Sequence, residues 1–395
     1  MNRNRRTLLA AFAMLATAAI AVGCCTPEKV ISDIPNFAYT SNENSNNISA
    51  YMLESGTGVL TPVTGSPFTG PSGPRDSVVE LLGKFLYVSN GGTNGVSGFS
   101  IDHTTGILSP ISGSPFAGGT GPRGIALAPS GKFLYTANRN TNDVSGYAID
   151  TDTGVLTPVT GSPFAIAPGA EEQPGPQQLT VDPTGRFLYV SDHLTGTISG
   201  FTINGAGSLA QISGSPFTDQ PQNLGGGLQP YALVASPSGA FLYVSNHGFS
   251  TLSVFSIDAA TGALKGITGS PFNIPPPSEC DAQPFGLAIT PSGQFLYMAE
   301  NGCSAVAVFS LDPDTGVPTQ TSHSPFFING ADDCFPSPLD DTLDFTGRFL
   351  YVANQGCGNI SGYSVNPTTG DLTELTGSPF PAGSAPYGVA ISRIN

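Results

Sequence analysis

The pattern of apolar and polar positions repeats along most of the chain. Its clearest mark is a six-residue segment in which an aromatic residue and further apolar residues precede Asn, Asp or Glu. Seven copies start at Phe37, Phe85, Phe133, Phe187, Phe241, Phe295 and Phe349, and successive copies lie 48 or 54 residues apart. A fixed period of this length indicates that one supersecondary unit is repeated side by side.

One repeat, that of the third copy, predicts four short strands. Gly124–Ala128 and Phe133–Ala137 are expected as the first and second strands, joined by a tight Pro-Ser-Gly-Lys turn. Val144–Ile149 and Val155–Val159 are expected as the third and fourth strands. The second strand is apolar on both faces, which is typical of a strand between neighbouring sheets. Pro158 suits an outer edge strand.

These observations predict an all-β fold, a seven-bladed β-propeller of four-stranded antiparallel blades. The repeats begin on a second strand at Phe37 and end on a lone first strand at Pro386–Ile391. We expect this C-terminal strand to pair with the N-terminal blade, because that pairing closes the ring and removes its open edges. The predicted organisation is a signal peptide (1–23), a lipidated tether (24–36) and the propeller (37–395).

The N-terminus has the features of an export signal. Three arginines precede the apolar run 8–22, which is shorter than a membrane span. Small residues before Cys24 resemble a bacterial lipobox, which implies that Cys24 carries lipid. The alternatives are an ordinary signal peptide that leaves Cys24 free and, at Arg5-Arg6, a faint twin-arginine signal. The expected location is therefore that of an exported, membrane-anchored lipoprotein facing the periplasm or the cell exterior.

The charge balance limits the partners. The chain has 13 Lys and Arg against 28 Asp and Glu, a net charge of −15. An acidic surface repels polyanions, so nucleic-acid binding is unexpected, and multiply phosphorylated substrates are disfavoured. We expect no cofactor, no metal, membrane contact only through the N-terminal lipid, and a monomer.

Four cysteines follow the repeat. Cys280 and Cys334 precede a first strand, Cys303 and Cys357 follow a second strand, and each pair is 23 residues apart. Partners then lie nearly opposite each other across an antiparallel pair of strands. In an exported protein this spacing predicts the disulfides Cys280–Cys303 and Cys334–Cys357. The alternative is a zinc site made of four thiolates.

The first strand starts, and the second strand ends, at the same edge of each blade, which we call the top rim. The additional residues of the longer repeats fall at this rim, in the loops 165–176, 218–230, 273–284 and 327–338. Insertions gathered on one face usually mark the working face of a repeat protein. The alternative is tolerated variation in loop length.

Polar side chains at the top rim are the candidates for chemistry. We number the blades along the chain, starting with the blade that contains Phe37. Blades 3 to 5 then carry basic residues at this rim, and we expect these residues to face the carboxylates of blades 7, 1 and 2. His and carboxylate side chains can act as acid or base, and Arg can hold an anion or oxyanion. The predicted catalytic residues are His193, His247, Arg123 and Glu43. The predicted substrate-binding residues are Arg75, Asp76, Arg139, Tyr231, Phe285, Asp340 and Tyr387. The alternative is that they are ordinary solvated loop residues.

Three motifs carry a resemblance to a known family: Asp-x-x-Thr-Gly-x-Leu, Pro-Ser-Gly-Lys/Arg-Phe-Leu-Tyr-Val, and Pro-Arg at the head of the first strand. They resemble the seven-bladed lactonases, which include 6-phosphogluconolactonases and muconate-type lactonising relatives. The resemblance implies a site built from Arg and His at the head of a first strand and Glu after a second strand. Arg75, Arg123 and Glu43 match, whereas Gly124 or Asp76 stands at the histidine position.

Two functions remain open at this stage. The main expectation is a binding or interaction module that recognises a protein or glycan partner through its top rim, because the histidine of the family is replaced. The alternative is a lactonase that hydrolyses a neutral or weakly anionic sugar lactone, which the arc of Arg and His side chains favours.

Overall fold

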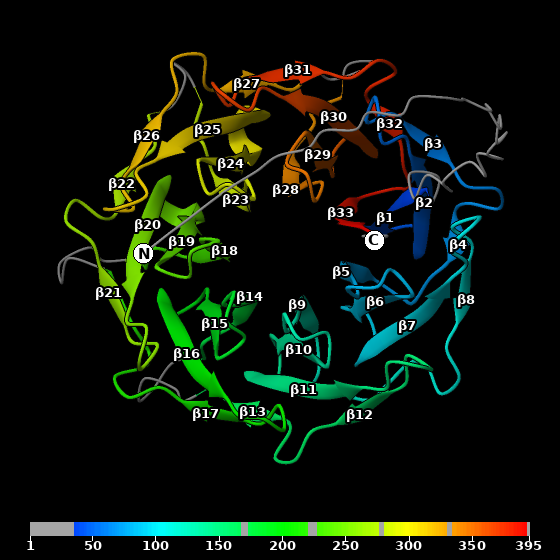
Figure 1. Cartoon of the computed structure of the whole chain (residues 1–395), viewed down its shortest axis with the longest axis horizontal. Helices are drawn as coiled ribbons and strands as arrows, with labels where there is room; N and C mark the ends of the chain where they lie inside the picture. Colours follow the sequence, from blue (N-terminus) through cyan, green and yellow to red (C-terminus); the bar gives the residue numbers. More distant parts are fainter. Residues whose placement is uncertain (1–34, 167–172, 220–226, 276–279, 330–333, 393–395) are drawn as a thin grey trace, which may run out of the picture. The chain divides into compact units, whose positions relative to one another are not determined.

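Seven antiparallel sheets stand side by side in a ring, and each forms one blade of a β-propeller (Figure 1). The computed structural model describes residues 35–166, 173–219, 227–275, 280–329 and 334–392. Within these ranges the helices are the short 3-10 turns η2 (His247–Phe249) and η3 (Asn301–Cys303). No helix in this part of the chain has the length and apolar character needed to cross a bilayer.

The strands of each blade follow one another from the centre of the ring outwards (Figure 1). The innermost strands, in order from blade 1 to blade 7, are β33 (Pro386–Ile391), β5 (Pro74–Val79), β9 (Pro122–Leu127), β14 (Pro176–Val181), β18 (Pro230–Ala235), β23 (Pro284–Ile289) and β28 (Pro338–Leu343). The second strands are β1 (Asn36–Asn42), β6 (Phe85–Asn90), β10 (Phe133–Asn138), β15 (Phe187–Asp192), β19 (Phe241–Asn246), β24 (Phe295–Glu300) and β29 (Phe349–Asn354).

The outer half of each blade has the same order. The third strands are β2 (Asn47–Leu53), β7 (Val96–Ile101), β11 (Asp143–Ile149), β16 (Thr197–Ile203), β20 (Thr251–Ile257), β25 (Ala305–Leu311) and β30 (Asn359–Val365). The outermost strands are β3 (Leu60–Pro62), β8 (Leu108–Pro110), β12 (Leu156–Pro158), β17 (Leu209–Gln211), β21 (Leu264–Gly266), β26 (Pro318–Gln320) and β31 (Leu372–Glu374). The fold class predicted from the sequence is therefore confirmed.

The strand limits differ slightly from those expected. The first strand of blade 3 starts at Pro122, two residues before Gly124, because Pro122 already pairs with Asn138. A Ser-Pro-Phe segment, preceded by Gly except at His323, follows the fourth strand of every repeat, and in five blades its Phe starts a two-residue strand that pairs with the third strand. These are β4 (Phe68–Thr69), β13 (Phe164–Ala165), β22 (Phe272–Asn273), β27 (Phe326–Phe327) and β32 (Phe380–Pro381).

Adjacent blades are joined by a repeated contact between two sequence motifs. The Tyr hydroxyl of each second strand, in a Phe-Leu-Tyr segment or in Phe37-Ala-Tyr39, donates a hydrogen bond to the Gly carbonyl in the outer turn of the next blade, as Tyr351 does to Gly58 at 2.6 Å. The same bond occurs at all seven interfaces. Gly58 has φ +74°, and a Cβ there would lie 2.4 Å from the ring of Phe349. Both facts require glycine at this position.

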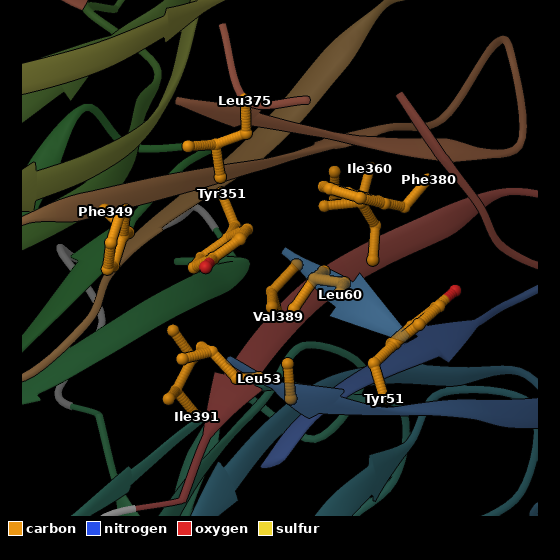
Figure 2. Close-up of a cluster of buried hydrophobic side chains, with 12 residues drawn as sticks. Tyr51, Leu53, Leu60, Phe349, Tyr351, Ile360, Leu375, Phe380, Val389 and Ile391 are labelled. Atoms are coloured by element: carbon orange, nitrogen blue, oxygen red, sulfur yellow. The ribbon is translucent and has the colours of Figure 1, made fainter. Parts of the chain in front are cut away.

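The C-terminal strand closes the ring as predicted. β33 pairs antiparallel with β1, and Ala38 lies opposite Ile391. Figure 2 shows Val389 and Ile391 beside Leu53 of the same blade and Tyr351 of blade 7, so β33 also packs against blade 7. Complete burial of a Val or Ile side chain stabilises by roughly 1.5–3 kcal/mol. This closure thus fixes the seven innermost strands around one centre.

Several sequence predictions lie outside the described residues. The proposed signal peptide, Cys24 and most of the tether fall within residues 1–34, and the middle of each long top-rim loop is likewise outside the described ranges. Lipid attachment therefore stays a prediction.

Candidate functional site

The top rim brings together two positions of every blade: the second residue of the innermost strand and the first residue after the second strand. Each innermost strand has a register shift near its start, such as that between Pro74 and Ser77 in β5. A bulge of this kind disturbs the strict alternation of side chains. Arg75 and Asp76, which are consecutive, consequently both contact residues of other blades.

Three arginines from blades 2 and 3 occupy one side of this site. Arg75 Nη2 lies 2.6 Å from Glu43 Oε1, and Arg139 Nη1 donates to Gln177 Oε1 at 2.7 Å. Burial, and then the charges of Arg123 and Arg75, lower the pKa of Arg139. Among the described residues of the rim, Glu43 is the carboxylate that pairs with an arginine. The three guanidinium groups therefore retain a surplus of positive charge in an acidic protein.

This arrangement corrects one expectation. Glu43 was expected to face the basic residues across the ring, but it forms an ion pair with Arg75 of the neighbouring blade. The physical reason is that residues at these two rim positions meet between consecutive blades rather than across the centre.

Four aromatic rings from blades 4 to 6 form the other side. The ring centroids of His193 and Tyr231 are 6.2 Å apart, and those of Tyr231 and Phe285 are 4.3 Å apart. His247 lies 4.8 Å from Phe285 and 6.4 Å from His193. The two predicted catalytic histidines thus lie in one aromatic cluster, next to the arginines.

The environment keeps both histidines uncharged at neutral pH. Burial, followed by the charges of Arg139, His247 and Arg123, lowers the pKa of His193, against an opposing backbone hydrogen bond. Burial also lowers the pKa of His247, which the charge of Asp281 partly opposes. A neutral imidazole offers one nitrogen lone pair as a base.

The tautomer of His193 follows from its contact with the backbone. His193 Nδ1 lies 3.3 Å from the carbonyl oxygen of Pro230. A carbonyl only accepts, so Nδ1 carries the proton and Nε2 has the free lone pair. His247 Nδ1, in contrast, is buried and has no hydrogen-bond partner in the described ranges.

Tyr231 and Tyr387, which were predicted to bind substrate, are buried more deeply than that role requires. Their relative exposures are 9% and 4%, and they pack with Ala232 and Leu339 in the centre of the ring. Their hydroxyl groups, from blades 5 and 1, are hydrogen-bonded to each other. This buried layer forms the floor of the site.

Two of the predicted binding carboxylates, Asp76 and Asp340, lie around Gly388 of β33. A Cβ on Gly388 would lie 3.1 Å from Asp76 Oδ1 and 3.4 Å from Asp340 Oδ2. Burial raises the pKa of Asp76 to about 6, and burial with the charge of Asp76 raises that of Asp340 to about 8. Asp76 also accepts hydrogen bonds from Ile125 N and Gln178 Nε2, which ties blades 2, 3 and 4 together.

Sequence reasoning missed three residues with a part in this region. Gln177 carries the hydrogen bond to Arg139, Asp341 is a further buried carboxyl beside Asp340, and Glu300 is buried at the end of β24. Glu300 had a signal that was overlooked, since it stands where most repeats have Asn. No group of three His, Cys, Asp or Glu in the described ranges is arranged to hold a metal ion.

The cysteines are joined in the expected pairs. Cys280 bonds to Cys303 and Cys334 to Cys357, with Cα–Cα distances of 5.4 and 5.5 Å. The zinc alternative is therefore wrong, because the disulfides consume all four thiols. Each bond ties the loop before an innermost strand to the loop after the second strand of the same blade, at the top rim.

The fold and the site define a class: a seven-bladed β-propeller with a cationic and aromatic site at one end of its centre. The sequence matches the family described as "Lactonase, 7-bladed beta-propeller" over residues 30–170, 165–329 and 273–387. The chain belongs to this seven-bladed lactonase family.

Curated relatives carry the name 6-phosphogluconolactonase. The protein of Pectobacterium carotovorum is 25% identical over 230 residues, which cover 56% of this chain and 62% of the relative. That of Sodalis glossinidius is 28% identical over 212 residues, covering 53% and 59%. The matched regions thus span about three fifths of the relatives' length.

Solved structures share the fold. A periplasmic gluconolactonase of Pseudomonas aeruginosa has a TM-score of 0.73 at 19% identity, covering 92% of this chain and 99% of its own. A protein of Lactobacillus plantarum has a TM-score of 0.72 at 20% identity, covering 91% and 100%. Of the two functions left open by the sequence, the family assignment favours the lactonase.

Proposed function

We propose that this protein is a lactonase, which hydrolyses the internal ester of a small hydroxy acid at its top rim. The observation that carries the proposal is His193, whose Nδ1 contact with the Pro230 carbonyl leaves Nε2 free and whose pKa is lowered by burial and then by the charges of nearby Arg139 and Arg123. Ester hydrolysis near neutral pH needs an unprotonated base for water and a positive charge for the developing oxyanion. The family and its named relatives support the same reaction class.

The proposed reaction is a hydrolysis in which His193 acts first as general base and then as general acid. A water molecule attacks the lactone carbonyl carbon while its proton passes to Nε2 of His193. Arg123 stabilises the negative charge on the carbonyl oxygen. The bond from this carbon to the ring oxygen then breaks, and the protonated His193 returns the proton to the leaving alkoxide. The product is an open-chain hydroxy acid.

His193 is a better base than His247 because its ring is held in one tautomer. Its Nδ1–H is directed to the Pro230 carbonyl, which leaves Nε2 to accept a proton. His247 lacks such a contact in the described ranges and serves as part of the aromatic wall beside Phe285.

The substrate class that fits best is a small lactone without several negative charges. The net charge of −15 disfavours highly phosphorylated molecules. The arginines suit a monoanionic carboxylate product, because a guanidinium pairs bidentately with carboxylate. An exported, lipid-anchored form, which the features of residues 1–24 favour, places the reaction outside the cytoplasm.

The test is a lactone panel followed by acid release, using glucono-1,5-lactone, galactono-1,4-lactone and 6-phosphogluconolactone with purified residues 26–395. His193→Gln is expected to lower kcat by about 10²–10⁴, the usual contribution of a general base. His103→Gln is the matched control, since His103 lies in the turn between β7 and β8, on the opposite rim.

Two outcomes would contradict the proposal. One is full activity in His193→Gln. The other is a wild type that turns over no lactone of the panel but binds a glycan or protein through the top rim, which would restore the binding-module hypothesis.

A further inference from the structure

Tyr387 has an unusual place in the ring, because it comes from the strand that closes it. It is the second residue of β33, and its exposure is 4%. The guanidinium carbon of Arg75 lies 5.2 Å from the centroid of the Tyr387 ring. A cation at this distance from an aromatic face is attracted by the ring quadrupole. Tyr387 thus holds one of the three arginines directly.

Tyr387 reaches a second arginine through a buried amide. Gln177 Nε2 donates to the Tyr387 hydroxyl oxygen at 3.2 Å, and Gln177 Oε1 accepts from Arg139 Nη1 at 2.7 Å. Gln177 is 2% exposed, and the Tyr387 hydroxyl is also bonded to that of Tyr231. The chain of hydrogen bonds connects blades 5, 1, 4 and 3 beneath the rim. Because the links through Tyr231, Tyr387 and Gln177 are buried and the last one, to Arg139, is partly buried, the Arg139 guanidinium has little freedom to turn away.

The arrangement of the three guanidinium groups is electrostatically unfavourable without a bound anion. Arg75, Arg123 and Arg139 repel one another, and this repulsion adds to burial in lowering the pKa of Arg139. Glu43 compensates the charge of Arg75 only. Among the described residues, the surplus corresponds to about two positive charges in a small, half-buried region. A bound anion removes the repulsion, which is why such groups tend to be built for anion recognition.

We propose that Tyr387 positions Arg75 and Arg139 as a binding site for a carboxylate anion, so that closure of the ring also assembles this site. Tyr387 is a positioning residue: it acts through the two arginines. The identification of the carboxylate with the ring-opened product rests on the proposed lactonase function; the presence of an anion site does not. A direct consequence is inhibition of the enzyme by hydroxy acids.

The probe is gluconate, with binding measured by titration calorimetry on residues 26–395 at low ionic strength. Tyr387→Phe keeps the ring over Arg75 and removes the hydroxyl, with its hydrogen bonds to Gln177 and Tyr231. We expect its gluconate Kd to rise about fivefold, the factor that corresponds to one net hydrogen bond. The matched control is Tyr297→Phe, which removes a buried tyrosine hydroxyl bonded to Gly370 O at another blade interface. The control is expected to keep the wild-type Kd.

A second variant tests the chain of bonds. Gln177→Leu is expected to weaken gluconate binding about as much as Tyr387→Phe does, and the double variant no further, since both break the same connection. With a lactone that is turned over, Tyr387→Phe is expected to raise KM and the gluconate inhibition constant while kcat changes little. If Tyr387 had only a structural role, Tyr387→Phe would lower the melting temperature without raising KM and the inhibition constant selectively over kcat.

The outcomes separate the two proposals. A wild type that binds no gluconate at millimolar concentration overturns the anion site, and so does a Tyr387→Phe protein with unchanged Kd. Gluconate binding that depends on Tyr387, in a protein without lactonase turnover, refutes the proposed function and leaves this inference standing.

Discussion

Glu300 allows a direct test of whether a carboxyl buried in the ring makes the stability of the protein depend on pH. It ends β24, where five other blades have Asn. In blade 7 that position is Asn354, whose Nδ2 donates to Ser361 Oγ at 2.8 Å. Blade 6 has Ala307 in place of the serine. Glu300 is fully buried, and neither of its carboxyl oxygens has a hydrogen-bond partner in the described ranges.

The magnitude follows from the pKa of this carboxyl. Burial raises the pKa of Glu300 to about 8, against ~4.3 for an exposed glutamate. The folded protein therefore binds a proton that the unfolded chain has lost. This contribution to stability is complete below pH ~4 and is lost as the pH rises through about 8. Because one pKa unit corresponds to ~1.4 kcal/mol, the change between pH 5 and 8 is roughly 3–4 kcal/mol.

The perturbation is the double substitution Glu300→Asn with Ala307→Ser, which restores the pair found in blade 7. The free energy of unfolding is measured by urea titration at pH 5, 6, 7 and 8. We expect the double variant to lose stability less steeply with pH, by up to about 1.4 kcal/mol per pH unit. Glu374→Gln, on the exposed strand β31, is the control and is expected to follow the wild type.

The free energy of unfolding is expected to fall with pH in every variant, because other buried carboxyls remain. Burial also raises the pKa of Asp192 to about 7 and that of Asp340 to about 8. The effect of Glu300 is the difference in this pH dependence between the variants. A double variant whose stability falls with pH as steeply as that of the wild type would contradict the raised pKa of Glu300.

Three further predictions concern a disulfide, a hydrogen bond between two blades and lipid attachment at Cys24. Cys303→Ser is expected to lower the free energy of unfolding by roughly 3 kcal/mol, from the entropy of a loop closed over 23 residues, and an unchanged urea midpoint would contradict this. Tyr351→Phe is expected to cost about 1 kcal/mol in the same assay, because the Gly58 carbonyl between blades 7 and 1 loses its donor; a variant as stable as wild type would count against that role. Labelling with a palmitate analogue in a bacterial host is expected to mark the wild type and not Cys24→Ser, and equal labelling of both would exclude the lipid at Cys24.

The sequence predicted which residues lie at the top rim, but it did not predict which of them contact one another. The repeat positions identified Arg75, Arg123, Arg139, His193 and His247 as rim residues, because strand ends are set by local turns. The sequence did not indicate that Glu43 pairs with Arg75 or that Asp76 lies by Gly388. Such contacts join different blades, and they depend on which side chains fill the space that the ring leaves.

The sequence by itself determined the number of blades, the order of strands, the closure by Pro386–Ile391 and both disulfides. Each of these follows from a pattern that recurs at a fixed period, and an antiparallel blade of known period has one register that buries its apolar side chains. The tertiary structure alone decided the depth of Tyr387, its hold on two arginines and the burial of Glu300. These depend on desolvation and on contacts between residues more than 200 positions apart, such as Gln177 and Tyr387, which meet only when the ring is closed.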